Sequence, residues 1–162
     1  MQIILVVETR ASCGSDYRYI KSAIDYFYVE RSFKISKIFA KTKSELVSCD
    51  KKIKEYKNKY IGVTKVIVCA DYDSENDPSN DVIINYCDTH SYDLVWMNVN
   101  VEDVFLGRIV PDRDKNRESF KFLKRKNTYL SSNIVLNNPS PLDKRPASNL
   151  LTVLDKYLKR KT

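Results

Sequence analysis

An apolar run that ends abruptly in two aspartates is the feature that most constrains the fold of this chain. Residues 66–70 read Val-Ile-Val-Cys-Ala, and Asp71, Tyr72 and Asp73 follow at once, before a stretch of turn-forming residues. This pattern is typical of a buried parallel strand whose C-terminal end carries side chains into a site. Strand side chains alternate, so an extended chain would place the carboxylates of Asp71 and Asp73 on the same side.

A second apolar run of this kind opens the chain and stops at Glu8. If the two strands are neighbours in one sheet, about 4.8 Å apart, the carboxylates of Glu8, Asp71 and Asp73 meet at one edge. Such a cluster repels itself unless a cation lies within it. The sequence therefore predicts a divalent-metal site suited to phosphate chemistry.

The order of the other segments predicts an α/β fold. Apolar spacing favours helices over 16–29 and 44–60, another after Pro78, and a short helix ending near Gly107; strands are expected over 35–40 and 92–97. Strands alternating with helices imply right-handed crossovers and a parallel sheet. We expect a mostly parallel four-stranded sheet with helices on both faces, and with the strand ends near Glu8, Ala40, Asp71 and Asn98 along one edge.

The last third of the chain is predicted to extend this core. Residues 112–127 are highly charged, and Phe120 and Leu123 are expected to supply their apolar contacts. Three prolines interrupt residues 128–146, and a leucine stripe predicts a helix over 148–159. We expect a single domain over 1–162, with a core of about 1–110 and a helical extension over 111–162.

Charge and cysteine content narrow the class of protein. There are 28 Lys and Arg against 21 Asp and Glu, a formal net charge of +7. A basic surplus around a local acidic cluster suits a polyanionic partner such as nucleic acid, although a lysine-rich protein without such a partner has the same balance. The four cysteines form no C-x-x-C pair, which favours reduced thiols. We also predict a cytoplasmic protein with no membrane partner, because the first apolar run is too short for a signal segment or a membrane span.

Three common sites fit the acidic stretch poorly. In an EF-hand loop starting at Asp71, the position that needs glycine is Asn76 and the bidentate glutamate would be Val82. The chain has only three glycines, and they cannot form a phosphate-binding glycine loop. Phosphatases that use an aspartyl nucleophile usually carry their Asp-x-Asp pair on the first strand, whereas here it follows the third predicted strand.

A glutamate ending the first strand, together with Asp-x-Asp ending a later one, resembles the Toprim domain, the metal-binding catalytic fold of topoisomerases, primases and several nucleases. The likeness covers roughly residues 1–98, and it is closest to the small RloB type, related to the OLD-family nucleases. It rests on Val7-Glu8-Thr9 and on residues 69–73, Cys-Ala-Asp-Tyr-Asp. Weaker parts are residues 98–106 with Glu102, and residues 145–149, Arg-Pro-Ala-Ser-Asn.

The resemblance implies a metal-dependent nuclease that hydrolyses phosphodiester bonds in DNA or RNA. Glu8 would be a general acid or base or a metal ligand, and Asp71 and Asp73 would bind Mg²⁺ or Mn²⁺, with Glu102 as a further ligand. The positively charged side chains that could contact substrate phosphates are Arg10, Lys144 and Arg145. The RloB likeness also implies a role in defence against phage, beside a separate ATPase partner. The oligomeric state, including a homo-oligomer, stays open.

Each of these assignments has a structural alternative. Asp71 and Asp73 are also common turn and cap residues at a strand end. Glu102 could simply be an acidic residue in the first turn of a helix, and Lys144 and Arg145 could belong to a solvated loop. On that interpretation the protein is a non-catalytic module that binds nucleic acid or regulates an ATPase.

Overall fold

The computed structural model describes residues 1–9, 14–29, 33–132, 135–143 and 145–161. Its elements, in chain order, are β1 (Gln2–Glu8), α1 (Ser15–Phe27), β2 (Lys34–Ala40), α2 (Lys43–Leu46), α3 (Asp50–Asn58), β3 (Thr64–Tyr72), α4 (Ser79–His90), β4 (Asp93–Asn98), α5 (Val101–Leu106), the 3-10 turn η2 (Asp112–Asp114), α6 (Lys115–Ser131), the 3-10 turns η3 (Val135–Asn137) and η4 (Pro141–Asp143), β5 (Ala147–Ser148) and α7 (Leu150–Leu154).

The described strands form one sheet in the order β2-β1-β3-β4-β5. The first four are parallel, as predicted, and β5 pairs antiparallel with β4. The register sets Glu8 beside Ala40, Val7 beside Cys69 and Asp71 beside Met97, so the four parallel strands end along the same edge. This is an α/β fold compatible with the Rossmann-like class.

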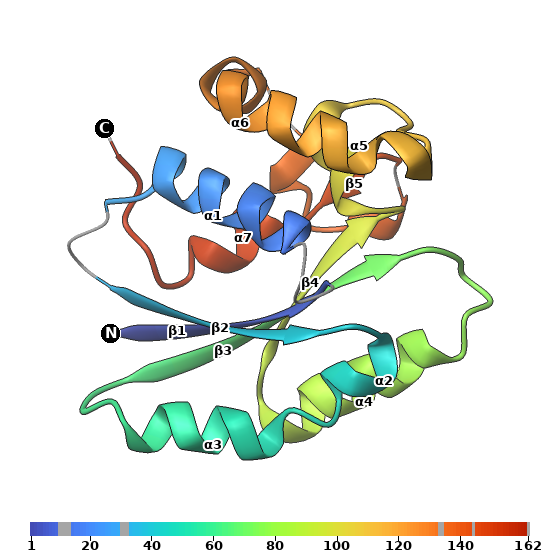
Figure 1. Ribbon diagram of the computed structural model, residues 1–162. Coiled ribbons are helices and arrows are strands. Elements are labelled where there is room, and N and C mark those ends of the chain that lie inside the picture. The colour runs from blue at the N-terminus through green and yellow to red at the C-terminus, as the bar shows by residue number, and fades with distance from the viewer. Residues whose placement is uncertain (10–13, 30–32, 133–134, 144, 162) are drawn as a thin grey trace.

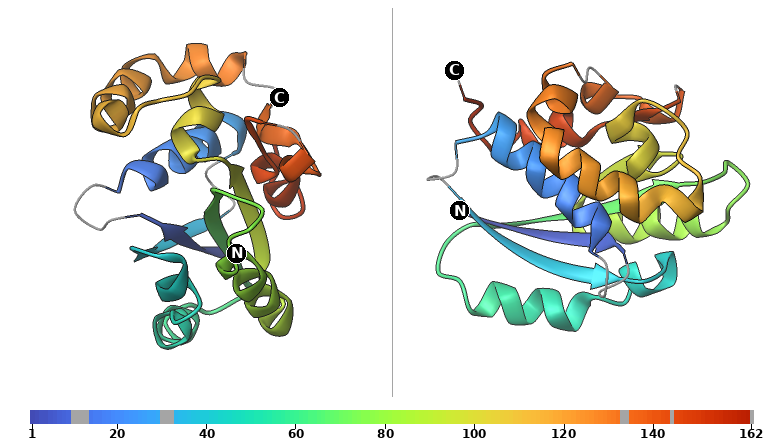
Figure 2. Two further views of the ribbon diagram at one scale, coloured as in Figure 1. Left: turned by 90° about the vertical axis from the view of Figure 1, so that its right-hand side faces the viewer. Right: turned by 45° about the horizontal axis from the view of Figure 1, so that its top comes forward.

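Helices cover both faces of the sheet (Figure 1). One face packs against α1, α5 and α7, with α6 lying over α1 and α5, and the opposite face packs against α2, α3 and α4. The same three layers are visible in both further views (Figure 2). Because β1 is covered on both sides, it is apolar almost throughout, and its residues 3–7 are at most 1% exposed.

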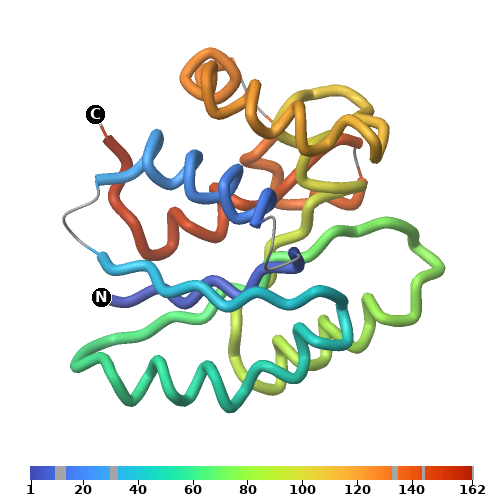
Figure 3. Tube along the Cα trace, viewed as in Figure 1, coloured from blue at the N-terminus to red at the C-terminus, as the bar shows by residue number. Residues whose placement is uncertain are grey.

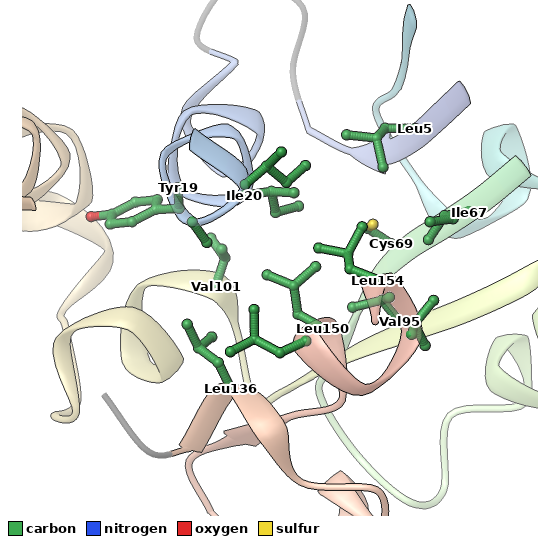
Figure 4. Packing of buried hydrophobic residues seen from close by; sticks show 14 of the residues in the cluster. Leu5, Tyr19, Ile20, Ile67, Cys69, Val95, Val101, Leu136, Leu150 and Leu154 are labelled. Carbon is green, nitrogen blue, oxygen red and sulfur yellow. The ribbon is translucent and has the colours of Figure 1, made fainter. Parts of the chain in front are cut away.

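The larger of the two cores lies between the sheet and α1. Figure 4 shows Leu5, Ile67 and Val95 from three adjacent strands facing Ile20 of α1 and Leu154 of α7. Tyr19, at the far side of α1, extends this cluster to the rings of Phe105 and Phe122, whose centroids lie 5.3 and 4.5 Å from its own. The packing fixes α1 on the sheet and joins α6 to the core.

The fifth strand was not predicted. Residues 147–148 were expected at the start of a helix over 148–159, but they pair with the edge of β4, and the helix α7 covers only Leu150–Leu154. Asn149 extends the pairing through its side chain: its Oδ1 accepts from the Trp96 backbone amide and its Nδ2 donates to the Leu94 carbonyl, both at 3.0 Å. These bonds satisfy β4 backbone groups that would otherwise remain unpaired at a sheet edge.

Two helix predictions also need correction. The helix expected over 44–60 is two helices, α2 and α3, because Ser48 Oγ and Cys49 Sγ donate to carbonyls of α2 and compete with the helical backbone bonds. In α6, the expected apolar contacts Phe120 and Leu123 are exposed, and Phe122 and Leu130 are buried in their place. A charged helix carries little apolar periodicity, so its inward face was assigned wrongly.

The end of the chain closes over α1. Tyr28, which is fully buried just after α1, donates from its hydroxyl to Asp155 Oδ1 at 2.7 Å and forms a β-bridge with Arg160. The Lys161 amide donates to the Phe27 carbonyl at 2.8 Å, and Figure 3 shows the C-terminal segment running beside the end of α1. Among the described residues, no helix is both long and apolar enough to cross a membrane.

Replacing Tyr28 with Phe should therefore lower the free energy of unfolding by about 1–2 kcal/mol, because a buried hydrogen bond to a carboxylate is lost while the ring remains packed. Denaturant unfolding measures this difference. Tyr26→Phe, at a partly buried tyrosine that packs edge-on against Phe27, is the matched control and should change stability by less than half as much. Equal losses for the two variants would contradict a role for the Tyr28 hydroxyl.

Candidate functional site

An acidic cavity opens at the edge where the parallel strands end. Its volume is about 460 Å³, and its lining combines five carboxylates from five different elements with polar and basic neighbours: Glu8, Thr9, Ser15, Asp16, Lys41, Asp71, Glu102, Asp112, Lys115 and Asn116. Asp112, in η2, is exposed, and the other four carboxylates lie deeper in the cavity. The strand order reverses between β1 and β3, with β2 on one side and β4 on the other. In open α/β sheets, the crevice beyond such a reversal is where ligands bind.

Glu8 and Asp71 lie on either side of this reversal. The Asp71 backbone amide donates to Glu8 Oε2 at 3.4 Å, so the two residues are in direct contact. Their side chains belong to opposite faces of the pleat: Asp71 follows Ile67 and Cys69 toward α1, whereas Glu8 follows Ile4 and Val6. They meet because each lies at the end of its strand, where the cavity spans both faces.

Asp16 and Glu102 complete the acidic set from helix starts. Asp16 is in the first turn of α1, where it accepts from the Ser15 hydroxyl at 2.7 Å. Glu102 is in the first turn of α5 and is only 3% exposed. Helix N-termini favour negative side chains, which partly offsets their burial.

A tight connection between β4 and α5 positions Glu102. Val99 adopts φ 64°, a left-handed conformation rare for a β-branched residue, and its amide donates to Asn98 Oδ1 at 3.1 Å. Asn98 also donates to the Pro141 carbonyl at 2.8 Å, and Asn100 caps α5 by accepting from the Asp103 amide at 2.9 Å. These bonds turn the chain sharply and aim the first turn of α5 at the cavity.

Two lysines counter the acidic charge from opposite sides. Lys115, at the start of α6, lies 4.0 Å from Glu102 Oε2 and 3.0 Å from Asp112 Oδ1. Lys43, at the start of α2, is only 8% exposed and donates to Asp77 Oδ2 at 2.6 Å. Its Nζ is also 3.3 Å from Asp73 Oδ2.

Asp73 is therefore placed differently from Asp71. The strand β3 ends at Tyr72, one residue before Asp73. The extended backbone that would have placed both carboxylates on the same side therefore does not include Asp73. The Asp73 side chain is 63% exposed, pairs with Lys43, and is not among the side chains that line the acidic cavity. The Lys43 ion pairs join the turn after β3 to α2.

Burial and mutual repulsion keep the acidic groups protonated more than usual. Burial, reinforced by Asp16, raises the pKa of Glu102 to about 7. Burial raises the pKa of Glu8 to about 7 as well, although the Asp71 amide and Lys43 oppose the rise. The pKa of Asp71 lies well above its ordinary value because it is buried and faces Asp16, Glu8 and Glu102. Burial likewise raises the pKa of Asp16.

The donor chemistry of this cavity fits a hard divalent cation. In the described part of the chain, no group of three His, Cys, Asp or Glu side chains lies close enough together to bind one metal ion. Mg²⁺ keeps several of its waters and is commonly bound through one or two carboxylates, and Glu8 and Asp71 both line this cavity. Glu102 and Asp16 line the same cavity.

The other predicted site residues divide into two groups. Arg10 and Lys144 lie outside the described residues. Arg145 is described and exposed, and it is not among the residues that line the cavity. Sequence reasoning missed Asp16 and Lys115 as site residues, because it placed the first at the start of a predicted helix and the second in the charged stretch over 112–127. The only local signal for Asp16 was its place directly after the polar loop that follows Glu8.

The fold and site thus define an α/β protein with an acidic cavity at the reversal point of a parallel sheet. The chain matches no family model, no curated protein and no solved structure at a significant level.

The raised pKa of Glu8 predicts a pH dependence of stability in the metal-free protein. The pKa of Glu8 is higher in the folded state than in the unfolded chain. The contribution of protonated Glu8 to the free energy of unfolding is therefore fully present below about pH 4.5 and is lost as the pH rises through about 7. Glu8→Gln mimics the protonated side chain. In EDTA, the melting temperature of this variant should be close to that of wild type at pH 5 and should exceed it increasingly toward pH 8. The difference should be about 2–4 °C for each kcal/mol of electrostatic destabilisation that the substitution removes.

Thermal melts at several pH values measure this divergence. Glu75→Gln, at an exposed turn, removes one negative charge elsewhere and serves as the control. A Glu8→Gln variant whose melting temperature keeps a constant offset from wild type between pH 5 and pH 8 would show that Glu8 does not titrate in this range.

Proposed function

We propose that this protein is a metal-dependent nuclease of the Toprim type that hydrolyses phosphodiester bonds in DNA or RNA. The observation that carries the proposal is the acidic cavity itself, which is lined by carboxylates from β1, β3, α1 and α5 at the reversal point between β1 and β3. Burying four such groups together is unfavourable unless a cation offsets their charge. Cavities of this composition suit Mg²⁺ or Mn²⁺.

Glu8 and Asp71 would hold the ion, with Glu102 and Asp16 as neighbours that bind it directly or through water. When bound, the ion would offset negative charge on the phosphate and lower the pKa of water. Glu8, whose pKa is raised to about 7, can exchange a proton near neutral pH, as a general base or acid requires. Lys41 and Lys115 line the same cavity and can attract substrate phosphate.

Asp73 would have a supporting role in this proposal. Its ion pair with Lys43 keeps that lysine beside the cavity, where its charge opposes the rise of the Glu8 pKa. Direct contact with the ion would require Asp73 to leave Lys43. The sequence-based assignment of Asp73 as a ligand therefore stays a prediction, as do the phosphate contacts of Arg10, Lys144 and Arg145.

The wider proposal follows from the resemblance to the RloB-type and OLD-family nucleases. It places the protein in the cytoplasm, in defence against phage, with a nucleic-acid substrate and a separate ATPase as partner. The second candidate is a non-catalytic module that binds nucleic acid or regulates an ATPase. It is favoured by the present separation of the carboxylates, since no three described metal-ligating side chains converge.

Cleavage of mixed DNA and RNA substrates separates the two candidates. Wild type should cut at least one of them in Mg²⁺ or Mn²⁺ and should be inactive in EDTA. Asp71→Asn should lose at least a hundredfold in rate, because it removes a ligand and a buried charge together, whereas Asp81→Asn, at an exposed position of α4, should retain activity. Binding without cleavage in either metal would support the non-catalytic module.

The same substitution should also change how metal affects stability. Asp71→Asn removes part of the repulsion within the cavity, so in EDTA it should melt no lower than wild type. Wild type should gain about 2.7 kcal/mol when Mg²⁺ is present at a hundredfold excess over its Kd, and the variant should gain far less. Melts in EDTA and in millimolar Mg²⁺ measure both effects. A variant clearly less stable in EDTA would identify Asp71 as a structural cap.

A further inference from the structure

A second cavity, of about 420 Å³, lies along the open edge of the sheet, and we call it the β2 groove. The strand β2 is the first in the sheet order and has no described neighbour on this side. The groove wraps around this edge from the outer strand to α3 and is lined by Lys37, Ile38, Phe39, Lys52, Glu55, Tyr56 and Lys59. The mechanism proposed above uses none of these residues.

The charge of the β2 groove is opposite to that of the acidic cavity. Lys37, Lys52 and Lys59 are exposed, and Glu55 is the single acidic side chain among the lining residues. The acidic cavity, in contrast, is lined by five carboxylates and two lysines. A polyanion would be attracted to the first surface and repelled from most of the second, except where a cation is bound.

Aromatic side chains accompany the lysines. The Lys37 ammonium lies over the rings of Tyr17 and Phe39, 4.9 and 5.4 Å from their centroids, which holds the cation at the edge of the sheet. Tyr56 of α3 is partly buried and lines the groove between Lys52 and Lys59, which are three or four residues away and so lie on its face of the helix. Lysines beside an aromatic ring are the pattern that binds the backbone and bases of unpaired nucleic acid.

The β2 groove leads to the acidic cavity along one strand. Lys37 and Phe39 are in β2, and Lys41, directly after its end, lines the acidic cavity beside Glu8. At about 3.3 Å per residue, Lys37 and Lys41 are about 13 Å apart. Cationic side chains therefore continue from the middle of the open edge to the carboxylates.

We propose that the β2 groove binds an unpaired strand of nucleic acid and guides its backbone into the acidic cavity. This inference rests on the proposed nuclease function and adds its substrate class. The phosphates contact Lys37, Lys52 and Lys59, and one base stacks on Tyr56. Lys41 contacts the nucleic-acid backbone where it reaches the carboxylates. An unpaired strand fits better than a duplex because stacking on Tyr56 needs a base face that pairing within a helix would cover.

Binding of fluorescently labelled single-stranded oligonucleotides, measured by anisotropy in EDTA, tests the groove without any cleavage. The variant Lys37→Gln/Lys52→Gln/Lys59→Gln should bind at least tenfold more weakly than wild type at low salt. The control Lys51→Gln/Lys54→Gln/Lys124→Gln removes the same charge from exposed lysines that do not line the groove, and it should weaken binding less than threefold. Loss of three phosphate contacts should also reduce the slope of log K against log salt by about 2.

The stacking contact has a separate readout. Tyr56→Leu keeps an apolar side chain against the core but removes the aromatic ring, so it should weaken oligonucleotide binding at least fivefold while leaving the salt slope unchanged. A duplex of the same sequence should bind more weakly than the single strand to wild type. Tighter duplex binding, or a Tyr56→Leu variant that binds like wild type, would overturn the assignment of an unpaired strand.

The groove and the nuclease function fail in different ways. Equal weakening by the two triple variants would overturn the groove and leave its lysines as charges that protect an open strand edge from pairing. A groove variant that cleaves single-stranded substrate as fast as wild type at sub-saturating concentration would also overturn it, with the nuclease intact. Groove-dependent binding without cleavage in Mg²⁺ or Mn²⁺ would support the groove and reject the nuclease.

Discussion

The parallel pairing of β1 with both β2 and β3 is the constraint on which the rest of the structure depends. It aligns the strand ends at one edge and brings Glu8 into contact with the Asp71 backbone. It also places β1 between β2 and β3, with α1, which connects β1 to β2, on one face and α2 and α3, which connect β2 to β3, on the other. The acidic cavity follows from this reversal, because the helices diverge there and leave the strand ends uncovered.

Charge is segregated around this edge. The carboxylates point into the cavity, while the lysines lie at its margins: Lys43 on one side, Lys115 on the other, and the exposed lysines of the β2 groove beyond. The two lysines do not offset the effect of burial on the carboxylates, since Glu8, Asp71 and Glu102 keep raised pKa values. The net positive charge of the chain therefore coexists with a concentrated negative site, an arrangement suited to attracting a polyanion from a distance and a cation at close range.

The sequence was sufficient for the parts of the fold that depend on long apolar runs. Buried parallel strands appear in the sequence as continuous apolar runs, so the four parallel strands and the shared edge of Glu8 and Asp71 could be predicted. The β5 strand could not, because two residues paired through Ala147 and Ser148 have no periodicity. Asp16 and Lys115 were missed as site residues because their place in the cavity depends on how α1 and α6 pack, which tertiary contacts decide. Asp73 was expected beside Asp71 because the end of β3 at Tyr72 leaves no local mark in the sequence.

The carboxylates of Glu8, Asp71, Asp16 and Glu102 share one further property: each lies at a terminus of its element, at the ends of β1 and β3 and the starts of α1 and α5. Termini are where backbone hydrogen bonds open most easily, and like charges gathered there push the ends apart. We therefore expect the metal-free protein to open more easily along this edge than at the centre of its sheet, where Val6 and Val68 are fully buried. Amide hydrogen exchange in β1 and β3 would then be slow at the centre of each strand and fast toward the cavity. A bound cation would slow the exchange at the cavity ends of β1, β3, α1 and α5 together.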